Sequence, residues 1–305
     1  MKLQSATARK KITPSAQTNS VSASVTGFVV EAEREPLFTI NPNSSTIWLD
    51  LKDAWGHREL LFFLVWRDLK VRYRQTLLGV AWVILQPLLM ALVFTIFLSK
   101  LGHFRSDNVP YPIFAYAGLL PWIFFSNSVA TGSSSLLSNS YIITKVYFPR
   151  LLIPAAIVGV RLVDFLIASA VLILLMFVYG LGVGPRMFML PLVIAELTLL
   201  SLAVSSWFSV LNIKYRDVGT LLPVLIQVWM FASPIIYPSS MVPKQWQSLY
   251  SLNPMVGVVE AFRASLFGLP FNWNALIVSL AITLVLLGYL MWVFCRWQDR
   301  LVDKL

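Results

Sequence analysis

The chain has 305 residues, of which 57% are hydrophobic and only 12% carry a charge, and its formal net charge is +10. A soluble protein of this size exposes far more charge, and several apolar runs are long enough to cross a hydrocarbon core about 30 Å thick. The composition therefore predicts an all-α polytopic membrane protein, because a β-barrel would alternate in hydrophobicity over short segments of about ten residues. Basic loops on the cytoplasmic side explain the positive charge, so nucleic acid is not expected as a partner.

Residues 1–45 are rich in Ser, Thr, Ala and Asn and show no sustained hydrophobic periodicity. This composition predicts a mobile cytoplasmic tail. A signal peptide is not expected, because no apolar segment follows the basic residues near the start.

Residues 46–76 are predicted to form an amphipathic helix that lies in the cytoplasmic membrane interface. An apolar stripe recurs there at helical spacing and consists of Phe62, Trp66, Leu69 and Tyr73. Arg67, Lys70 and Arg74 fall on a different face of the same helix, which also carries Arg72. Two interpretations of the basic strip stay open: it is the positive flank of a first span, or it also contacts a cytosolic partner.

The remaining residues, 77–305, predict six transmembrane helices. Their expected bounds are Leu77–Ser99, Ile113–Leu137, Leu151–Tyr179, Met187–Leu211, Thr220–Tyr237 and Ala275–Cys295. The stretch 238–270 is too polar and too broken to span, and predicts two short re-entrant or interfacial helices. Six spans place both termini on one side, and the distribution of Lys and Arg makes that side cytoplasmic.

Polar residues inside the expected spans leave further alternatives. The second span turns rich in Ser and Thr towards its end, which indicates either close helix packing or a polar path for a solute. Arg161 and Asp164 are three positions apart in the third span and can pair, either as a functional site or as a local salt bridge that fixes packing. Glu196 stands alone in the fourth span, where we expect it to be protonated or hydrogen-bonded.

The sequence gives little support for a catalytic site or a cofactor-binding site. None of the 14 glycines is followed by Lys, so the chain has no GxxxxGK[ST] motif and is not expected to bind ATP itself. Two histidines and one cysteine do not support a metal site. A membrane enzyme acting on lipid-linked sugars would need clustered carboxylates, and Asp164 and Glu196 are too isolated for that. We therefore expect neither a catalytic site nor a cofactor site in this chain.

Four stretches together carry a family resemblance. They are RDLKVRYRQTLLGVAWVILQP (67–87), the region from LLPWIFF to YFPRLLIP (119–154), NIKYRDVGTLLPVLIQVWMFASPIIYP (212–238) and LNPMVGVVEAFRASLFG (252–268). In content and order they resemble the membrane permease subunits of ABC-2-type exporters, in particular those that export O-antigen, capsular polysaccharide or teichoic acid.

This resemblance implies a homodimer in the bacterial inner membrane, with a separate dimeric ABC ATPase on the cytoplasmic side that binds the ATP. It also implies that a lipid-linked polysaccharide passes through a channel between the two copies. The alternative within the same superfamily is an efflux permease for drugs or lipids.

The resemblance also suggests roles for individual residues. Aromatic and polar side chains in the spans are candidates for lining the channel: Trp82, Trp122, Phe125, Ser126, Asn127, Thr131, Trp207, Trp229, Phe231 and Tyr237. The basic residues Arg67, Lys70, Arg72 and Arg74 are candidates for binding the pyrophosphate of a lipid-linked substrate. The loop 138–149 and Arg150 directly after it would couple to the ATPase, and the candidate residues are Tyr141, Lys145, Tyr147 and Arg150. The segment 238–270 would gate the outer mouth through Trp246, Tyr250, Glu260 and Arg263, the last two being placed to pair.

Overall fold

The computed structural model describes residues 56–74, 79–97, 109–145, 148–182, 184–215 and 217–302, with side chains as far as Phe294. Within these ranges the chain forms helices and connecting turns and contains no strand, as the all-α prediction requires. The predicted tail 1–45, the first part of the predicted interfacial helix (46–55) and Tyr147 lie outside the described residues.

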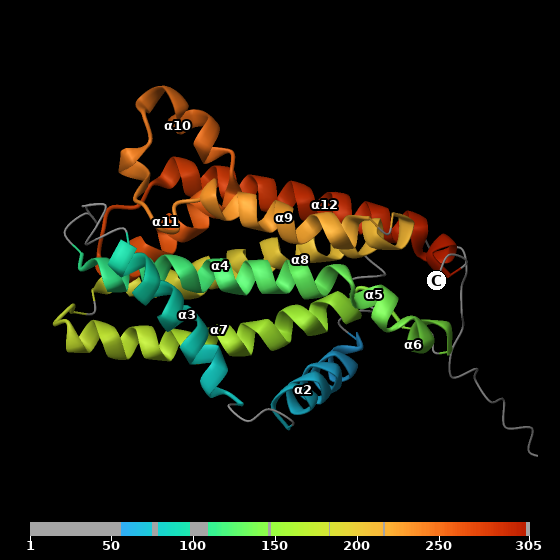
Figure 1. Ribbon diagram of the computed structural model, residues 1–305. Coiled ribbons are helices and arrows are strands. Elements are labelled where there is room, and N and C mark those ends of the chain that lie inside the picture. Colours follow the sequence, from blue (N-terminus) through green and yellow to red (C-terminus); the bar gives the residue numbers. More distant parts are fainter. Residues whose placement is uncertain are drawn as a thin grey trace, which may run out of the picture. The chain divides into compact units, whose positions relative to one another are not determined.

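The helices follow one another along the chain as Figure 1 shows. They are α2 (Arg58–Arg74), α3 (Ala81–Phe94), α4 (Tyr111–Ser133), α5 (Ser135–Ser138), α6 (Ser140–Lys145), α7 (Leu152–Val178), η2 (Pro185–Met189), α8 (Leu190–Lys214), α9 (Val218–Phe231), η3 (Ser239–Met241), α10 (Lys244–Ser251), α11 (Pro254–Phe267) and α12 (Trp273–Val302). Four stretches of the described chain are long and apolar enough to cross a membrane: Tyr111–Ser133, Leu152–Val178, Pro185–Lys214 and Trp273–Phe294. Two further apolar helices are shorter, Ala81–Phe97 and Val218–Phe231.

The helix α4 lies at the centre of the bundle. It packs against α3, α7, α8, α9 and α11 (Figure 1). In its most apolar window 78% of the residues are buried, against 28% in the corresponding windows of α7 and α12. The outer helices therefore keep apolar surface for lipid or for another protein, while α4 is a core element.

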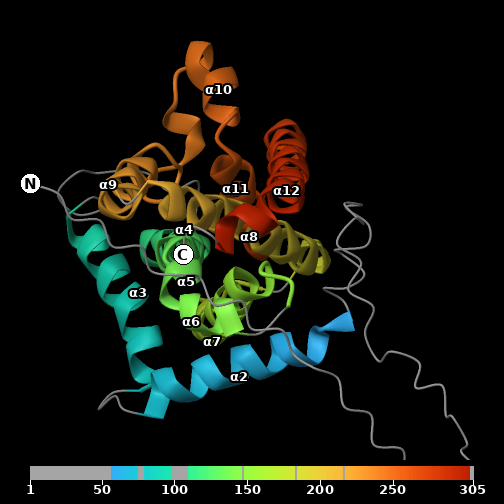
Figure 2. The ribbon, with the colours of Figure 1, turned by 90° about the vertical axis from the view of Figure 1, so that its right-hand side faces the viewer.

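A second apolar cluster lies at one end of the bundle. It joins α2, α6, the start of α7 and the ends of α8 and α12, through residues such as Leu64, Ile143, Leu152, Ile213 and Leu290. Figure 2 shows α2 lying across the bundle next to α7, on the side opposite α10. The contact is close, because a Cβ at Gly159 of α7 would lie 2.9 Å from the Val65 side chain of α2.

The helix α11 has clear start and stop signals in the sequence. Asn253 is its N-cap and accepts a hydrogen bond from the Met255 backbone N–H (3.1 Å), and Pro254 follows at the first position. The helix ends before Gly268, which adopts a left-handed conformation with φ of 68°. The predicted second helix of the 238–270 segment thus exists, and most of it is buried.

Two predicted span ends were wrong. The predicted fifth span, Thr220–Tyr237, overruns α9, which ends at Phe231 and is followed by a buried turn. The predicted second span runs to Leu137, whereas α4 ends at Ser133 and α5 follows as a separate turn of helix. Ser133 and Ser134 bond back to carbonyls three residues earlier, and such contacts compete with the helical ladder.

Candidate functional site

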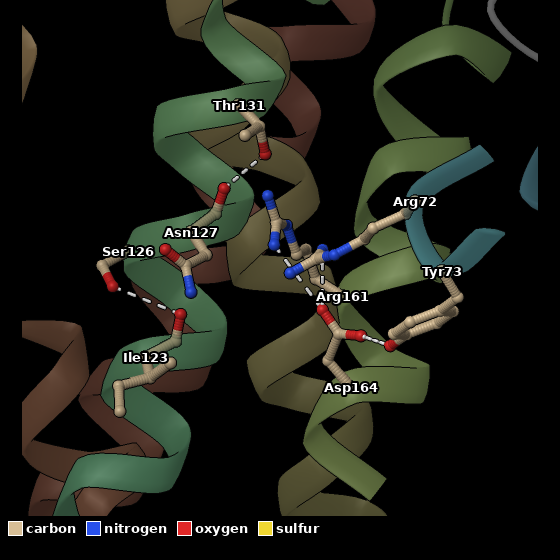
Figure 3. Close-up of polar contacts among 8 residues, drawn as sticks. All are labelled: Arg72, Tyr73, Ile123, Ser126, Asn127, Thr131, Arg161 and Asp164. Carbon is tan, nitrogen blue, oxygen red and sulfur yellow. Dashed lines mark hydrogen bonds and ion pairs between the residues drawn. The ribbon is translucent and has the colours of Figure 1, made fainter. Parts of the chain in front are cut away.

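A cluster of charged side chains joins α2 to α7, and we call Arg72, Tyr73, Arg161 and Asp164 the Asp164 cluster (Figure 3). Arg72 Nη1 lies 2.8 Å from Asp164 Oδ2, and Arg161 Nη1 lies 3.5 Å from the same oxygen. The Tyr73 hydroxyl donates to the other oxygen, Oδ1. One carboxylate therefore receives two guanidinium groups and a phenol.

The Asp164 cluster is half-buried and carries a net positive charge. The Asp164 side chain is 13% exposed and that of Arg72 34% exposed. Burial, followed by the hydrogen bond to Asp164, raises the pKa of Tyr73 to about 12. The phenol hence stays a neutral donor at physiological pH.

The basic residues of α2 do not form one surface. Arg72 turns to α7, and Arg67 pairs with its neighbour Asp68 at 2.8 Å. Lys70 and Arg74 are exposed, on the same outer side as the exposed aromatic side chains of Phe62, Phe63 and Trp66. The predicted pairing of Arg161 with Asp164 is confirmed, whereas the participation of Arg72 and Tyr73 was not predicted.

The polar residues of α4 divide into two groups. Ser128 and Ser133 are buried, and a Cβ at Gly132 would lie 2.7 Å from the Ser205 Cβ of α8. These positions support the close-packing interpretation. The second group, Ser126, Asn127 and Thr131, is half-buried on the side of α4 seen in Figure 3.

Of the half-buried polar residues of α4, Asn127 lies next to the Asp164 cluster. Ser126 donates to the Ile123 carbonyl (3.2 Å) and Thr131 to that of Asn127, so both hydroxyls are satisfied within their own helix. Asn127 lines a small hollow between α3, α4 and α7 together with Arg161 and Asp164. The hollow brings a polar α4 side chain close to the charged residues of α7.

The predicted channel aromatics occupy different environments. Trp122 and Phe125 are buried in the core, and Phe125 meets Trp229 edge-on with ring centroids 5.1 Å apart. Trp82 and Phe231 are 52% and 56% exposed. The half-buried members of the set are Trp207, Trp229 and Tyr237.

The predicted coupling segment forms the two short helices α5 and α6. Ile143 of α6 is buried in the second apolar cluster. Tyr141 and Lys145 are exposed, and the Lys145 ammonium lies 5.9 Å from the centre of the Tyr141 ring. Arg150 follows just before α7 and is half-buried. The helix α6 is thus anchored on one side and presents an aromatic and a cation on the other.

The predicted outer-gate residues lie on two helices, the mostly exposed α10 and the mostly buried α11. Trp246 of α10 is exposed, and the hydroxyl groups of Tyr250 and Tyr237 are 3.2 Å apart. Glu260 accepts a hydrogen bond from Asn272 at 3.0 Å. Arg263 is buried in α11 and donates to backbone carbonyl groups.

Glu196 of α8 is buried and hydrogen-bonded, in line with one of its two expectations. Its Oε1 lies 2.5 Å from the Ser279 hydroxyl of α12, which also lies 2.8 Å from the carbonyl of Pro254. The contact links α8 and α12 to the first residue of α11. No sequence pattern pointed to Ser279.

Comparison with known proteins places this architecture in a family. Residues 59–267, from α2 to the end of α11, match the family described as ABC-2 type transporter. The O-antigen export system permease protein RfbA of Myxococcus xanthus is 31% identical over 217 residues, which cover 70% of this chain and 82% of that protein. RfbA of Klebsiella pneumoniae is 30% identical over 206 residues, covering 67% and 79%. The polysialic acid transport protein KpsM of Escherichia coli is 29% identical over 232 residues, covering 72% and 89%. The chain therefore belongs to the ABC-2 type transporter family.

Proposed function

We propose that the chain is the permease subunit of an exporter that moves a lipid-linked polysaccharide across the bacterial inner membrane. The observation that carries this proposal is the similarity to RfbA and KpsM, which extends over most of the length of each protein. Because the sequence has no P-loop, a separate ABC ATPase would supply the energy.

In the proposed topology the chain crosses the membrane six times and both termini are cytoplasmic. The four long apolar helices would be joined as spans by α3 and α9. Lys145, Arg150 and Lys214 gather at the end of the bundle that holds the second apolar cluster, which supports a cytoplasmic position for this end. The helices α10 and α11 then belong to the outer side.

Two copies of the chain would enclose the polysaccharide path. The exposed apolar face of α9 supports a contact between two copies, because a second copy would cover it. This face consists of Leu221, Val224, Leu225, Val228 and Phe231. Sugars present apolar C–H faces as well as hydroxyl edges, so exposed aromatics such as Trp82 and Phe231 suit a polymer that must slide and not bind tightly. Ser126, Asn127 and Thr131 would add hydrogen-bonding groups near the cytoplasmic half of the path.

The ATPase would bind at the basic end of the bundle. We propose that α6 fits a cleft of the ATPase through Tyr141 and Lys145, while Ile143 transmits its movement to the second apolar cluster. The exposed cations Lys70 and Arg74 of α2 are the best placed of the basic residues to meet the pyrophosphate of the substrate, because Arg67 and Arg72 already have carboxylate partners.

Deletion of the gene in its own host tests the proposal. We expect surface polysaccharide to be lost and lipid-linked polysaccharide to accumulate on the cytoplasmic face of the inner membrane, and both effects to be reversed by the gene supplied on a plasmid. Blotting of the cell-surface and inner-membrane fractions with a glycan-specific antibody measures both amounts. A deletion strain with normal surface polysaccharide but altered resistance to drugs would instead favour the efflux permease.

A further inference from the structure

The turn that follows α9 is buried although it has no helical ladder. Ser233 and Ile235 in it have no exposed surface, and Ile236 is nearly covered. A buried carbonyl without a donor costs free energy, and within a membrane no bulk water is at hand to replace it. The hydrogen bonds of this turn therefore decide whether its path is fixed.

Each of six successive carbonyl groups, from Phe231 to Ile236, accepts a hydrogen bond. The donors are Tyr237 Oη to Phe231 O (2.9 Å), Asn253 Nδ2 to Ala232 O (3.0 Å), Ile235 N to Ser233 O (2.8 Å), Arg263 Nη1 to Pro234 O (2.6 Å), Arg263 Nη2 to Ile235 O (2.6 Å) and Tyr111 Oη to Ile236 O (2.8 Å). Four of these bonds come from side chains of α4, of α11 or of its N-cap. The turn is thus held by both helices and not by its own backbone alone.

Arg263 makes the largest contribution to this network. Arg263 is 4% exposed, and its guanidinium bridges two adjacent carbonyl groups of the turn and also donates to the Phe114 carbonyl of α4 (3.1 Å). The guanidinium carbon lies 3.6 Å from the centre of the Phe114 ring. A Cβ at Gly118 would overlap both Arg263 Nη2 and the Ile235 carbonyl, so glycine leaves the space that the guanidinium fills.

We propose that Arg263 is a positioning residue of the export path, which fixes the turn 232–237 as a rigid rim attached to α4 and α11. Trp229 lies in the last turn of α9, just before this rim, and Tyr237 is the last residue of the rim. The indole N–H of Trp229 donates to Asn253 (2.9 Å), which also donates to the Ala232 carbonyl. In this arrangement α10, which is mostly exposed, is the part of 238–270 that moves, and Arg263 anchors the rim. The inference rests on the proposed export function.

Export by variants of the complete transporter, with its ATPase and in its host membrane, tests the role of Arg263. We expect R263Q to lower export about tenfold, since two carbonyl groups lose a charged donor, while membrane content and ATPase binding stay unchanged. R263K should retain part of the export, because one ammonium cannot bridge both carbonyl groups as the planar guanidinium does. G118A should resemble R263Q, and G288A is its control because no atom lies within 4 Å of an added Cβ there.

R186Q is the matched control for the arginine. Arg186 also donates to a carbonyl at α11, that of Gly268, but at the far end from the turn. We expect R186Q to export within about twofold of the unchanged protein, as an exposed hydrogen bond contributes little. If R186Q lost as much export as R263Q, the cause would be a general weakening of α11, and the positioning role of Arg263 would be overturned. Full export by R263K would also overturn it, because a positive charge alone would then suffice.

Hydrogen exchange of the purified full-length protein gives a second measurement that needs no substrate. We expect amides in 231–237 to exchange at least about fivefold faster in R263Q, with amides of α7 unchanged. If R263Q does not accumulate, Y111F replaces it, because it removes only the donor to Ile236 and should raise exchange in the same segment. Unchanged exchange would contradict the inference, whereas an unmodified transporter that exports no polysaccharide would contradict the proposed function alone.

Discussion

At the scale of single residues, Asp164 joins α2 to α7 by charge. It holds Arg72 of α2 and Arg161 of its own helix on one oxygen and Tyr73 on the other. Removing the carboxylate leaves two guanidinium groups facing each other without a counter-charge, whereas removing Arg72 still leaves Asp164 with Arg161. The two losses should therefore differ in size.

We expect D164N to lower the free energy of unfolding by about 2 kcal/mol and R72Q by about 1 kcal/mol or less, because Arg72 is one-third exposed. Unfolding in detergent with a graded denaturant measures both, and trypsin cleavage within α2 reports its release from α7. Equal losses in the two variants would contradict a carboxylate shared between two arginines.

The sequence predicts local pairs better than distant ones. Arg161 and Asp164 are three positions apart, and helical spacing alone predicts their contact. Tyr73 reaches the same carboxylate from 91 positions away, and no periodicity connects the two residues. The partners of Arg263 are backbone carbonyls, which every residue carries, so no residue type in the sequence marks them.

At the scale of helices, α4 and α8 meet along small residues. Gly132 of α4 lies against Ser205 of α8, and Asn212 of α8 donates to the Ser133 carbonyl of α4 at 3.0 Å. Such residues let two helix backbones approach closely, and the packing attraction grows as they do. The seam thereby fixes the central helix of the bundle.

We expect G132A to destabilise the protein by about 1–3 kcal/mol, because the added Cβ would lie 2.7 Å from that of Ser205 and the helices must separate. The control is G182A, where an added Cβ meets nothing within 4 Å. Thermal unfolding of both variants in detergent measures the difference. A stable G132A with no loss relative to G182A would contradict close packing at this seam.

Helix ends show why element bounds are harder to predict than element types. Hydrophobicity alone predicts α7 within one residue at each end, since apolar residues stop where the helix stops. It fails at α9, because hydrophobicity does not register Pro234, which has no backbone N–H and disfavours a helical conformation at Ser233. Side chains from α4 and α11 then bind the carbonyl groups of the turn.

At the scale of the whole molecule, the proposed transporter needs contact with an ATPase at its basic end. We expect K145E to weaken binding of the ATPase about tenfold and to lower export in parallel. The reason is that Glu would place a negative charge against an ATPase surface that is complementary to the positive charge of Lys145. K244E is the control, since Lys244 is also an exposed lysine but lies on α10, at the proposed outer side. Co-purification of the ATPase with each variant measures binding, and equal retention by K145E and K244E would exclude α6 from the contact.

In the proposed six-span topology, the shortness of α9 has a consequence for the surrounding bilayer. Its 14 residues rise about 21 Å, whereas a hydrocarbon core is about 30 Å thick. Lipid chains beside α9 would have to compress or tilt to match it, and such hydrophobic mismatch carries an elastic cost that grows with each ångström. A second copy placed over α9 would replace those strained lipids by protein. Bilayer thickness would then act on the association of the two copies, with thicker membranes favouring the dimer.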